Sequence, residues 1–141
     1  MVAYSFKGRF EPAIRAKRKR HTIRAIGKKR HARPGERMTM TTGDRFHPRQ
    51  MGSGICEAVQ PITINFEKTT KSGRRLAAHI VIGSPDDGAT VIRTPDLDDF
   101  ARRDGFEDWK DLCAFWRTTH GDLDAFTGLL ILWGDSFEPT P

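Results

Sequence analysis

The sequence predicts an α+β domain in which short strands fill the first two thirds of the chain and helices lie near its C-terminus. Apolar and polar residues alternate with period two in several runs before residue 94, as in half-buried strands. After Thr94 the apolar spacing becomes helical, and Thr94, Pro95 and Asp96 supply a hydroxyl cap, a first-turn proline and a first-turn acid. The 141 residues suit a single domain over residues 1–135, followed by a flexible tail over residues 136–141.

The N-terminal third is expected to contain three strands, one short helix and a long loop. Pro12 near the start of its segment favours a helix there, because proline is well tolerated in the first helical turn. The glycine-rich, polar segment after Gly43 has the composition of a mobile loop. In chain order, the expected elements are a strand over Val2–Phe6, a helix over Phe10–Ala16, strands over His21–Ile26 and Arg37–Thr42, and a loop over Asp44–Gly54.

The middle of the chain is expected to contain four more strands. Pro61 divides an apolar stretch, and since proline cannot donate to a sheet ladder, we expect a bend or a sheet edge there. The polar residues 68–75 predict the tip of a hairpin. In chain order, the expected elements are strands over Ile55–Val59, Ile62–Phe66 and Leu76–Ile82, a turn over Pro85–Gly88 and a strand over Ala89–Arg93.

The last third is expected to hold a helical pair and a closing strand. The first helix starts after Thr94 and is interrupted at Gly105, and an apolar strand follows over Phe126–Trp133. Between them, from Glu107 onward, apolar residues at helical spacing predict a core-facing stripe and not a cofactor site. The stripe consists of Trp109, Leu112, Cys113 and Trp116.

The charge of the chain is distributed unevenly. Residues 1–50 hold 15 Lys and Arg against 3 Asp and Glu, whereas residues 51–141 hold 9 against 15, within a formal net charge of +6. No apolar run approaches the roughly 18 residues needed to cross a bilayer, and the first residues lack the long apolar segment of a signal peptide. Two cysteines cannot form a disulfide framework. We therefore expect a reduced, cytoplasmic chain that does not contact a membrane.

A dense basic run over Arg15–Arg33 is expected to bind a polyanion, because each phosphate that is contacted releases condensed counterions. The alternative is a solvated arm or an import-like tract. Apolar Ile14, Ile23 and Ile26 within or beside the run favour packing of part of it on a core. The candidate phosphate-binding residues are Lys17, Arg18, Arg20, Arg24, Lys28, Lys29, Arg30 and Arg33.

The chain shows no sequence signature of a metal or cofactor site. Its five histidines and two cysteines lack metal-ligand spacings such as CxxC or HxxxH, so neither a metal nor a cofactor is expected. His21 and His31 lie in the basic run, and we expect them at the surface. The segment Gly52-Ser53-Gly54 is too short for a phosphate-binding loop and lacks the Lys-Thr that would follow.

Three segments together resemble the activating-signal-cointegrator homology (ASCH) family. They are the tract Lys19-Arg20-His21-Thr22-Ile23-Arg24, the turn Pro34-Gly35-Glu36, and the segment Phe100–Phe106 before a Trp- and Phe-containing helix. The resemblance covers roughly Tyr4 to Trp133. It implies a fold similar to the pseudouridine-synthase and archaeosine-transglycosylase (PUA) domain: a small, mostly closed β-barrel of about five to seven strands, with a short N-terminal helix, a late helical pair and a cleft beside the first helix.

The resemblance also implies contact with RNA or a modified nucleoside, and no obligate protein partner can be inferred from the sequence. A small amidohydrolase of this family removes the acyl group of N4-acetylcytidine with a Lys, a Thr and an acidic residue. Matched motif to motif, these residues fall on Lys19, Thr22 and Asp104. If the acid is normally Glu, Asp104 is one methylene shorter, which puts its reach to Lys19 in question.

In such an enzyme Thr22 would attack the acyl carbonyl, Lys19 would take its proton and Asp104 would orient the amine. Arg24, on the same strand face as Thr22, is expected to hold a phosphate or carbonyl oxygen, and Tyr4 and Phe6 are candidates for base stacking.

Two other functions remain open at this point: a metal-independent ribonuclease that uses the basic cleft, and a single-stranded RNA-binding module without catalysis. In the second case Lys19 contacts phosphate, Thr22 is an ordinary strand residue, and Asp104 pairs with Arg102 or Arg103.

Overall fold

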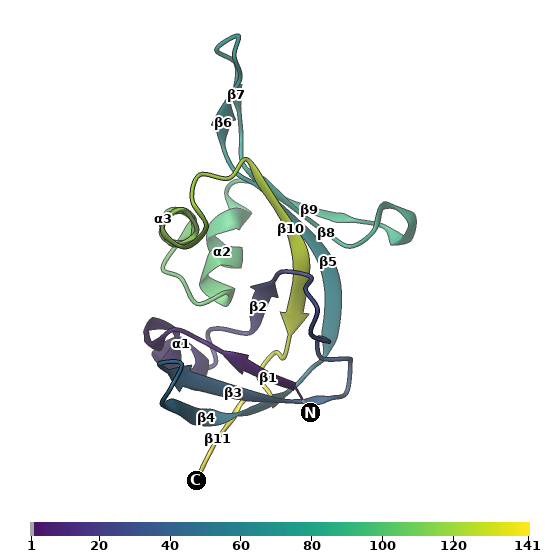
Figure 1. The fold of residues 1–141 in the computed structure, drawn as a ribbon. Coiled ribbons are helices and arrows are strands. Elements are labelled where there is room, and N and C mark those ends of the chain that lie inside the picture. The colour runs from purple at the N-terminus through teal and green to yellow at the C-terminus, as the bar shows by residue number, and fades with distance from the viewer. Residues whose placement is uncertain (1) are drawn as a thin grey trace.

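The computed structural model describes residues 2–141 and has an α+β fold with strands in three sheets and three short α-helices (Figure 1). The strands are β1 (Val2–Ser5), β2 (His21–Arg24), β3 (Arg37–Gly43), β4 (Pro48–Ile55), β5 (Ala58–Asn65), β6 (Lys68–Thr69), β7 (Arg75–Leu76), β8 (His79–Ile82), β9 (Thr90–Ile92), β10 (Ala125–Leu132) and β11 (Glu138–Pro139). The helices are α1 (Glu11–Arg15), α2 (Asp96–Arg103) and α3 (Trp109–His120), with 3-10 turns η1 (Gly8–Phe10) and η2 (Pro85–Asp87). No helix in this part of the chain is long and apolar enough to span a membrane.

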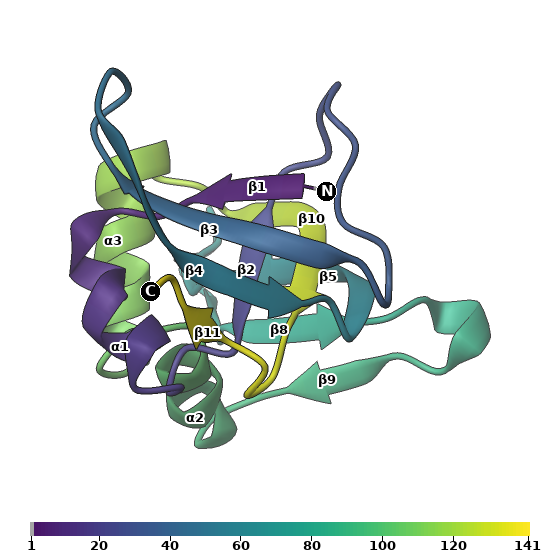
Figure 2. The same cartoon turned by 90° about the horizontal axis from the view of Figure 1, so that it is seen from below.

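Two sheets make the body of the molecule. The first has the strand order β1-β3-β4-β11 and the second β2-β10-β5-β8-β9, while β6 and β7 form a separate ribbon. β1 and β3 are parallel, and every other paired strand is antiparallel. In Figure 2 the strands β1, β3 and β4 cross in front of β2 and β10, with α1, α2 and α3 at one end of the two sheets.

The expected α+β class is confirmed, but the mostly closed barrel is not. Within residues 2–141 eleven strands form open sheets, where the resemblance implied about five to seven strands around one barrel. Among the described residues no strand ladder joins the first sheet to the second, so both sheets keep free edges. Three of the eleven strands, β6, β7 and β11, have only two residues each.

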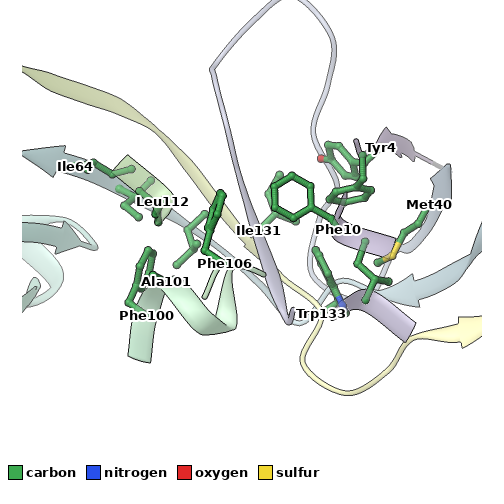
Figure 3. Close-up of a cluster of buried hydrophobic side chains, with 14 of the residues drawn as sticks. Tyr4, Phe10, Met40, Ile64, Phe100, Ala101, Phe106, Leu112, Ile131 and Trp133 are labelled. Atoms are coloured by element: carbon green, nitrogen blue, oxygen red, sulfur yellow. The ribbon is translucent and has the colours of Figure 1, made fainter. Parts of the chain in front are cut away.

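The core lies between the two sheets and extends under the helices. Figure 3 shows Phe100 of α2 and Leu112 of α3 beside Ile64 of β5, with Trp133 and Met40 at the other end of the same cluster. All five side chains are at most 1% exposed. Burying each one contributes on the order of 1.5–3 kcal/mol, so these contacts outweigh any single surface interaction.

The segment expected to be a mobile loop over Asp44–Gly54 is mostly strand β4, which pairs with β3. Its glycines are needed for close packing and not for flexibility. A Cβ at Gly52 would clash with the carbonyl of Glu138 and the ring of Phe137, and one at Gly54 would lie 3.1 Å from Met40 Cε. The polar, glycine-rich composition therefore marks a strand that another strand approaches closely.

The segment expected to be a flexible tail, residues 136–141, contains a buried aromatic ring and the short strand β11. Phe137 is 2% exposed, and β11 pairs with β4 through Glu138 and Pro139. Ser136 Oγ accepts a hydrogen bond from the Ile55 amide at 2.9 Å. One buried aromatic ring and a short ladder thus hold a segment whose charge and prolines are typical of a frayed end.

Pro61 lies inside the continuous strand β5 and not at a bend between two strands. Its carbonyl accepts a hydrogen bond from the Gly83 amide at 2.8 Å. Because the nitrogen and the carbonyl of a strand residue face the same side, the Pro61 nitrogen also faces Gly83, just beyond Ile82, where β8 ends. On the other side Pro61 pairs with Leu129 of β10. Proline is tolerated here because the missing N–H falls beyond the end of the neighbouring ladder.

Candidate active site

A tight turn after α1 places the Lys19 side chain inside the protein. Lys17 has a left-handed backbone with φ of 62°, which is uncommon for a residue other than glycine. The amides of the next two residues both donate to the carbonyl of Ala13, at 2.9 and 3.0 Å, and the Arg20 amide donates to the carbonyl of Arg103 at 2.7 Å. The turn is therefore tied to α1 and to the end of α2, and Lys19 is only 3% exposed.

Asp104 caps the C-terminal end of α2 and faces Lys19. A cation is favoured at this end of a helix because the unpaired carbonyl groups carry partial negative charge. Gly105 follows with φ of +97°, and a Cβ there would lie 2.9 Å from Lys19 Cδ and 3.0 Å from Phe10 Cδ1. The position requires glycine both for its backbone conformation and for the room that Lys19 occupies.

Lys19 and Asp104 form an ion pair in the interior. Lys19 Nζ donates to Asp104 Oδ1 at 3.0 Å and to the Asp104 carbonyl at 2.5 Å, so the shorter acid does reach the amine. Burial lowers the pKa of Lys19, although Asp104 acts in the opposite direction. Burial alone would raise the pKa of Asp104, but the charge of Lys19 and the hydrogen bond from His21 bring this pKa below its ordinary value. The carboxylate keeps its charge, while the amine releases its proton more easily than a surface lysine does.

His21 is a third member of this buried group. Its Nδ1 lies 3.1 Å from the same Asp104 oxygen that Lys19 contacts, and its ring stacks on Phe100 with centroids 4.9 Å apart. Burial lowers the pKa of His21 and so favours the neutral ring. A neutral ring that donates from Nδ1 leaves Nε2 without a proton, and within residues 2–141 the buried Nε2 has no hydrogen-bond partner. The expectation of a surface histidine at this position was wrong.

Thr22 lies on β2 beside the pair and is 5% exposed. Its Oγ1 accepts a hydrogen bond from Arg24 Nε at 3.1 Å, as the shared strand face predicts. Arg24 also donates to the Ser5 carbonyl at 2.8 Å, and its guanidinium lies 4.9 Å from the ring centroid of Phe6. In the described part of the chain Lys19 Nζ donates to Asp104 and not to Thr22.

Lys19, Thr22, Arg24 and Asp104 line one cavity of about 260 Å³, whereas His21 lies behind Asp104 and outside its lining. Ligand pockets for drug-sized molecules run from about 300 to 1,000 Å³, so this volume suits a ligand no larger than a nucleoside. Ser5, Lys7 and His120 complete its polar lining, and its apolar lining is largely aromatic. The aromatic side chains are Phe6, Phe10, Phe106, Phe115, Trp116 and Phe126.

Lys19 is held against two of these rings. Its Nζ lies 4.8 Å from the ring centroid of Phe10 and 5.7 Å from that of Phe6. An ammonium group over an aromatic face is stabilised, which partly opposes the effect of burial. Phe10 also packs edge-on against Phe106 and Phe115. The ring cluster therefore fixes the lysine and supplies a flat apolar wall beside it.

Of the eight predicted phosphate-binding residues, Arg24 alone lines this cavity. The other seven, Lys17, Arg18, Arg20, Lys28, Lys29, Arg30 and Arg33, are exposed. Arg30 forms a two-pronged ion pair with Glu36, at 2.8 and 2.7 Å. Ile26, expected to pack on the core, is 69% exposed. The loop over residues 25–36 begins at Ala25, which lines the cavity, and its Lys and Arg side chains are exposed to solvent.

Tyr4 does not line the cavity, in contrast to Phe6. Its hydroxyl accepts from the Ala32 amide at 3.0 Å and pairs with His31 Nδ1 at 2.9 Å. His31 Nε2 lies 2.9 Å from the carbonyl of Ala25. Tyr4 and the half-buried His31 thus anchor the basic loop, and Tyr4 lies outside the cavity lining.

Sequence reasoning missed His21 as a partner of Asp104, together with Gly105 and the aromatic wall. The spacing of His21, two residues after Lys19 and adjacent to Thr22, was the one signal that could have placed it at the site. The wall had no such signal, because Phe10, Phe106 and Phe115 come from distant parts of the chain.

Among residues 2–141 no group of three or more His, Cys, Asp and Glu side chains is placed to hold a metal ion. Comparisons with protein-family models, curated proteins and solved structures found no match to this chain. A function must therefore be inferred from the geometry of the cavity and its lining.

Proposed function

We propose that this protein hydrolyses the amide bond of an N4-acylated cytidine, presented as a nucleoside or within RNA. One observation carries the proposal: a buried amine paired with a carboxylate shares an aromatic-walled cavity with a threonine hydroxyl and an arginine. Burying Lys19 and Asp104 together is expensive in free energy, and perturbed buried groups that line a cavity are typical of functional sites.

In this mechanism Thr22 Oγ1 attacks the acyl carbonyl carbon and Lys19, in its neutral form, takes the hydroxyl proton. The carbon–nitrogen bond then breaks, and Lys19 returns the proton to N4 of the departing cytidine. Water, activated by Lys19 in the same way, hydrolyses the acyl-threonine ester and restores the hydroxyl. Asp104 positions the amine for all four proton transfers, as the acid of a catalytic triad positions its base.

Arg24 has two features that support a role in the same reaction. Its Nε already donates to Thr22 Oγ1, so the guanidinium can stabilise negative charge on that oxygen or on the carbonyl oxygen during attack. The pyrimidine would lie against the aromatic wall. Phe6, the stacking candidate that lines the cavity, is part of this wall, and its ring centroid lies 4.9 Å from the Arg24 guanidinium. The solvated cations of the basic loop would hold the phosphates of an RNA substrate.

The proposal includes kinship with the ASCH family and its PUA-like fold. Support comes from the order of elements: an N-terminal strand, a short helix, the Lys19–Arg24 tract, a strand after Pro34-Gly35, and a late helical pair. The cavity also lies beside the first helix, as in that fold. The two open sheets would then be a barrel of this type whose seam is not closed by hydrogen bonds.

A second candidate function is RNA binding without catalysis. It is favoured by one observation, namely that Lys19 donates to Asp104 while the Thr22 hydroxyl is bound by Arg24, so base and nucleophile are not joined. Catalytic hydrogen bonds often form only when substrate is present, and the first candidate requires the Lys19 amine to shift from Asp104 toward Thr22.

The test is release of cytidine from N4-acetylcytidine. Lys19→Met and Thr22→Val keep the volume and shape of the side chains but remove the base and the nucleophile, and each should lower the rate by about 100- to 10,000-fold. The matched controls are Lys28→Met, at an exposed lysine of the basic loop, and Thr63→Val, on β5 outside the cavity lining. Both controls should retain the rate of the unchanged protein.

Activity that survives Lys19→Met and Thr22→Val would reject these residues as the catalytic pair. RNA binding that weakens steeply with salt, with no turnover of N4-acetylcytidine, would leave the second candidate. Shortening of a single-stranded RNA that depends on the basic loop would point to a ribonuclease instead.

A further inference from the structure

A second cavity, of about 480 Å³, lies next to the candidate active site and has no part in the chemistry proposed above. Trp116 lines both cavities. Its ring contacts Phe126 and His120 of the first cavity, with centroids 4.6 and 4.5 Å away, and Phe66 of the second, 6.1 Å away. The two cavities thus share the Trp116 side chain in their linings.

The second cavity has an aromatic lining suited to a planar ring. Phe66 and the half-buried Trp109 stack with centroids 6.2 Å apart and an angle of 22° between their planes, next to Trp116. Leu123, which is 37% exposed, also lines this cavity. Aromatic faces of this kind bind nucleobases by stacking whatever the base is.

The charges around this cavity favour a ligand that carries phosphate. Its three carboxylates already have cationic partners: Glu67 with Arg75 at 2.8 Å, Asp122 with Arg117 at 3.3 Å and Asp124 with Lys68 at 3.7 Å. Lys110, at the start of α3, lines the cavity and has no ion pair among the described residues. Lys71 and Arg74 also have no ion pair among these residues; they lie outside the lining, in the turn between β6 and β7.

The β6–β7 ribbon extends this positive surface away from the body of the molecule (Figure 1). Four of the nine Lys and Arg in residues 51–141 lie in this ribbon, although that part of the chain is acidic overall. The ribbon begins directly after Phe66 and Glu67, which line the second cavity. The exposed cations of the ribbon therefore lie on the chain segment that directly follows two residues of the second cavity.

We infer that the second cavity binds the nucleotide adjacent to the acylated cytidine, so that the preferred substrate is a single-stranded RNA segment and not a free nucleoside. This inference rests on the proposed function for the identity of the first nucleotide. The neighbouring base stacks among Phe66, Trp109 and Trp116, Lys110 contacts the phosphate, and the β6–β7 ribbon contacts the backbone further along.

Cys113 provides a direct test, because it lines the second cavity and is partly exposed, whereas Cys56 is buried. Burial raises the pKa of Cys113 to about 11, so its reaction with a small thiol reagent is best followed in mildly alkaline buffer. At about four times its Kd, a short oligocytidylate should slow this reaction about fivefold through occupancy of the site, and cytidine at the same concentration should not. Cys113→Ser gives the background from Cys56.

Charge reversal tests the same path without relying on turnover. Lys110→Glu and Arg74→Glu should each reduce the slope of log affinity for oligocytidylate against log salt by about 0.7 or more. Arg93→Glu, at an exposed residue outside both cavity linings, is the matched control and should leave the slope unchanged.

The two proposals fail in different ways. If N4-acetylcytidine is hydrolysed but oligocytidylate leaves Cys113 equally reactive, the adjacent-nucleotide site is wrong and the catalytic proposal stands. If oligocytidylate protects Cys113 and no acylated substrate is hydrolysed, the site binds RNA and the catalytic proposal is wrong. Equal protection by oligodeoxycytidylate would extend the ligand to any single strand, and equal protection by cytidine alone would overturn the inference.

Discussion

One basic run of the sequence produces two regions with opposite properties. Lys19 is 3% exposed and paired with Asp104, whereas Lys28 and Lys29, only nine and ten residues later, are exposed on a solvated loop. The residue type is the same, so the difference comes from what surrounds the amine. A lysine in water contributes charge, while a buried lysine beside a carboxylate becomes a group whose proton can be moved.

The backbone explains why the two parts of the run separate. Near Lys19 the chain is fixed by bonds to Ala13 and Arg103, and the adjacent Ile14 is fully buried. After β2 the chain has no such anchor until His31, and Ile26 stays in solvent. Burial in this molecule therefore follows the hydrogen-bonded turn and not the local composition.

The largest expected effect is on stability, when one member of the buried pair is removed. Asp104→Asn or Lys19→Met leaves one buried charge with reduced compensation and should lower the free energy of unfolding by about 3–5 kcal/mol. Arg9→Met removes an exposed ion pair of 2.6 Å with Asp111 and should lower it by at most about 1 kcal/mol. Urea unfolding of the three variants measures the contrast, and equal losses would contradict it.

The double variant Lys19→Met/Asp104→Asn sharpens the same comparison. With both charges gone, no uncompensated ion stays in the interior, so the double variant should be more stable than either single one. Additive losses in the same urea measurement would show that the two residues act independently.

The next effect is on catalysis and concerns His21. His21→Asn keeps a donor close to the position of Nδ1, whereas His21→Gln moves it outward, so only the second should displace the Asp104 carboxylate. A displaced positioning group can reduce a rate by about 100-fold. We expect that loss of kcat in His21→Gln, with little change in KM, and a rate close to that of the unchanged protein in His21→Asn. Equal losses in both would assign His21 a packing role only.

A smaller effect is expected at Gly105, which connects α2 to the site. Gly105→Ala places a Cβ against Lys19 Cδ in a backbone conformation with φ of +97° and should lower stability by about 1–3 kcal/mol. The matched control is Gly88→Ala, whose φ of +86° is equally strained but whose Cβ would meet no neighbour within 4 Å. Thermal unfolding and cytidine release should both separate the two, since only Gly105→Ala displaces Lys19. Similar rates in the two variants would contradict the close fit at Gly105.

The sequence predicts the elements that depend on local patterns better than it predicts which residues are buried. Local patterns predicted β2, β9, β10 and the helical pair, because spacing and capping act over a few residues. Burial that depends on distant segments was not predictable. Gly52 was interpreted as a loop residue and Phe137 as part of a tail, yet each packs against the other. His21 was placed in solvent because its partner, Asp104, is 83 residues away.

The smallest effects are expected in the basic loop. Lys28→Glu and Lys29→Glu should change the free energy of unfolding by less than about 0.5 kcal/mol, since both residues are exposed. They should weaken RNA binding and reduce its salt dependence, while the rate on the free nucleoside stays constant. A fall in nucleoside turnover would mean that the loop belongs to the catalytic centre.

The most direct test of the central claim, that the buried Lys19 amine acts as the base, is the pH dependence of kcat/KM for N4-acetylcytidine. The rate should rise as Lys19 loses its proton, with a midpoint below the ordinary lysine pKa of 10.5, because burial lowers this pKa. In Asp104→Asn the carboxylate no longer helps to retain that proton, so the midpoint should move to lower pH while the maximal rate falls. A midpoint that stays in place in Asp104→Asn, or a rate that does not depend on pH, would contradict the account.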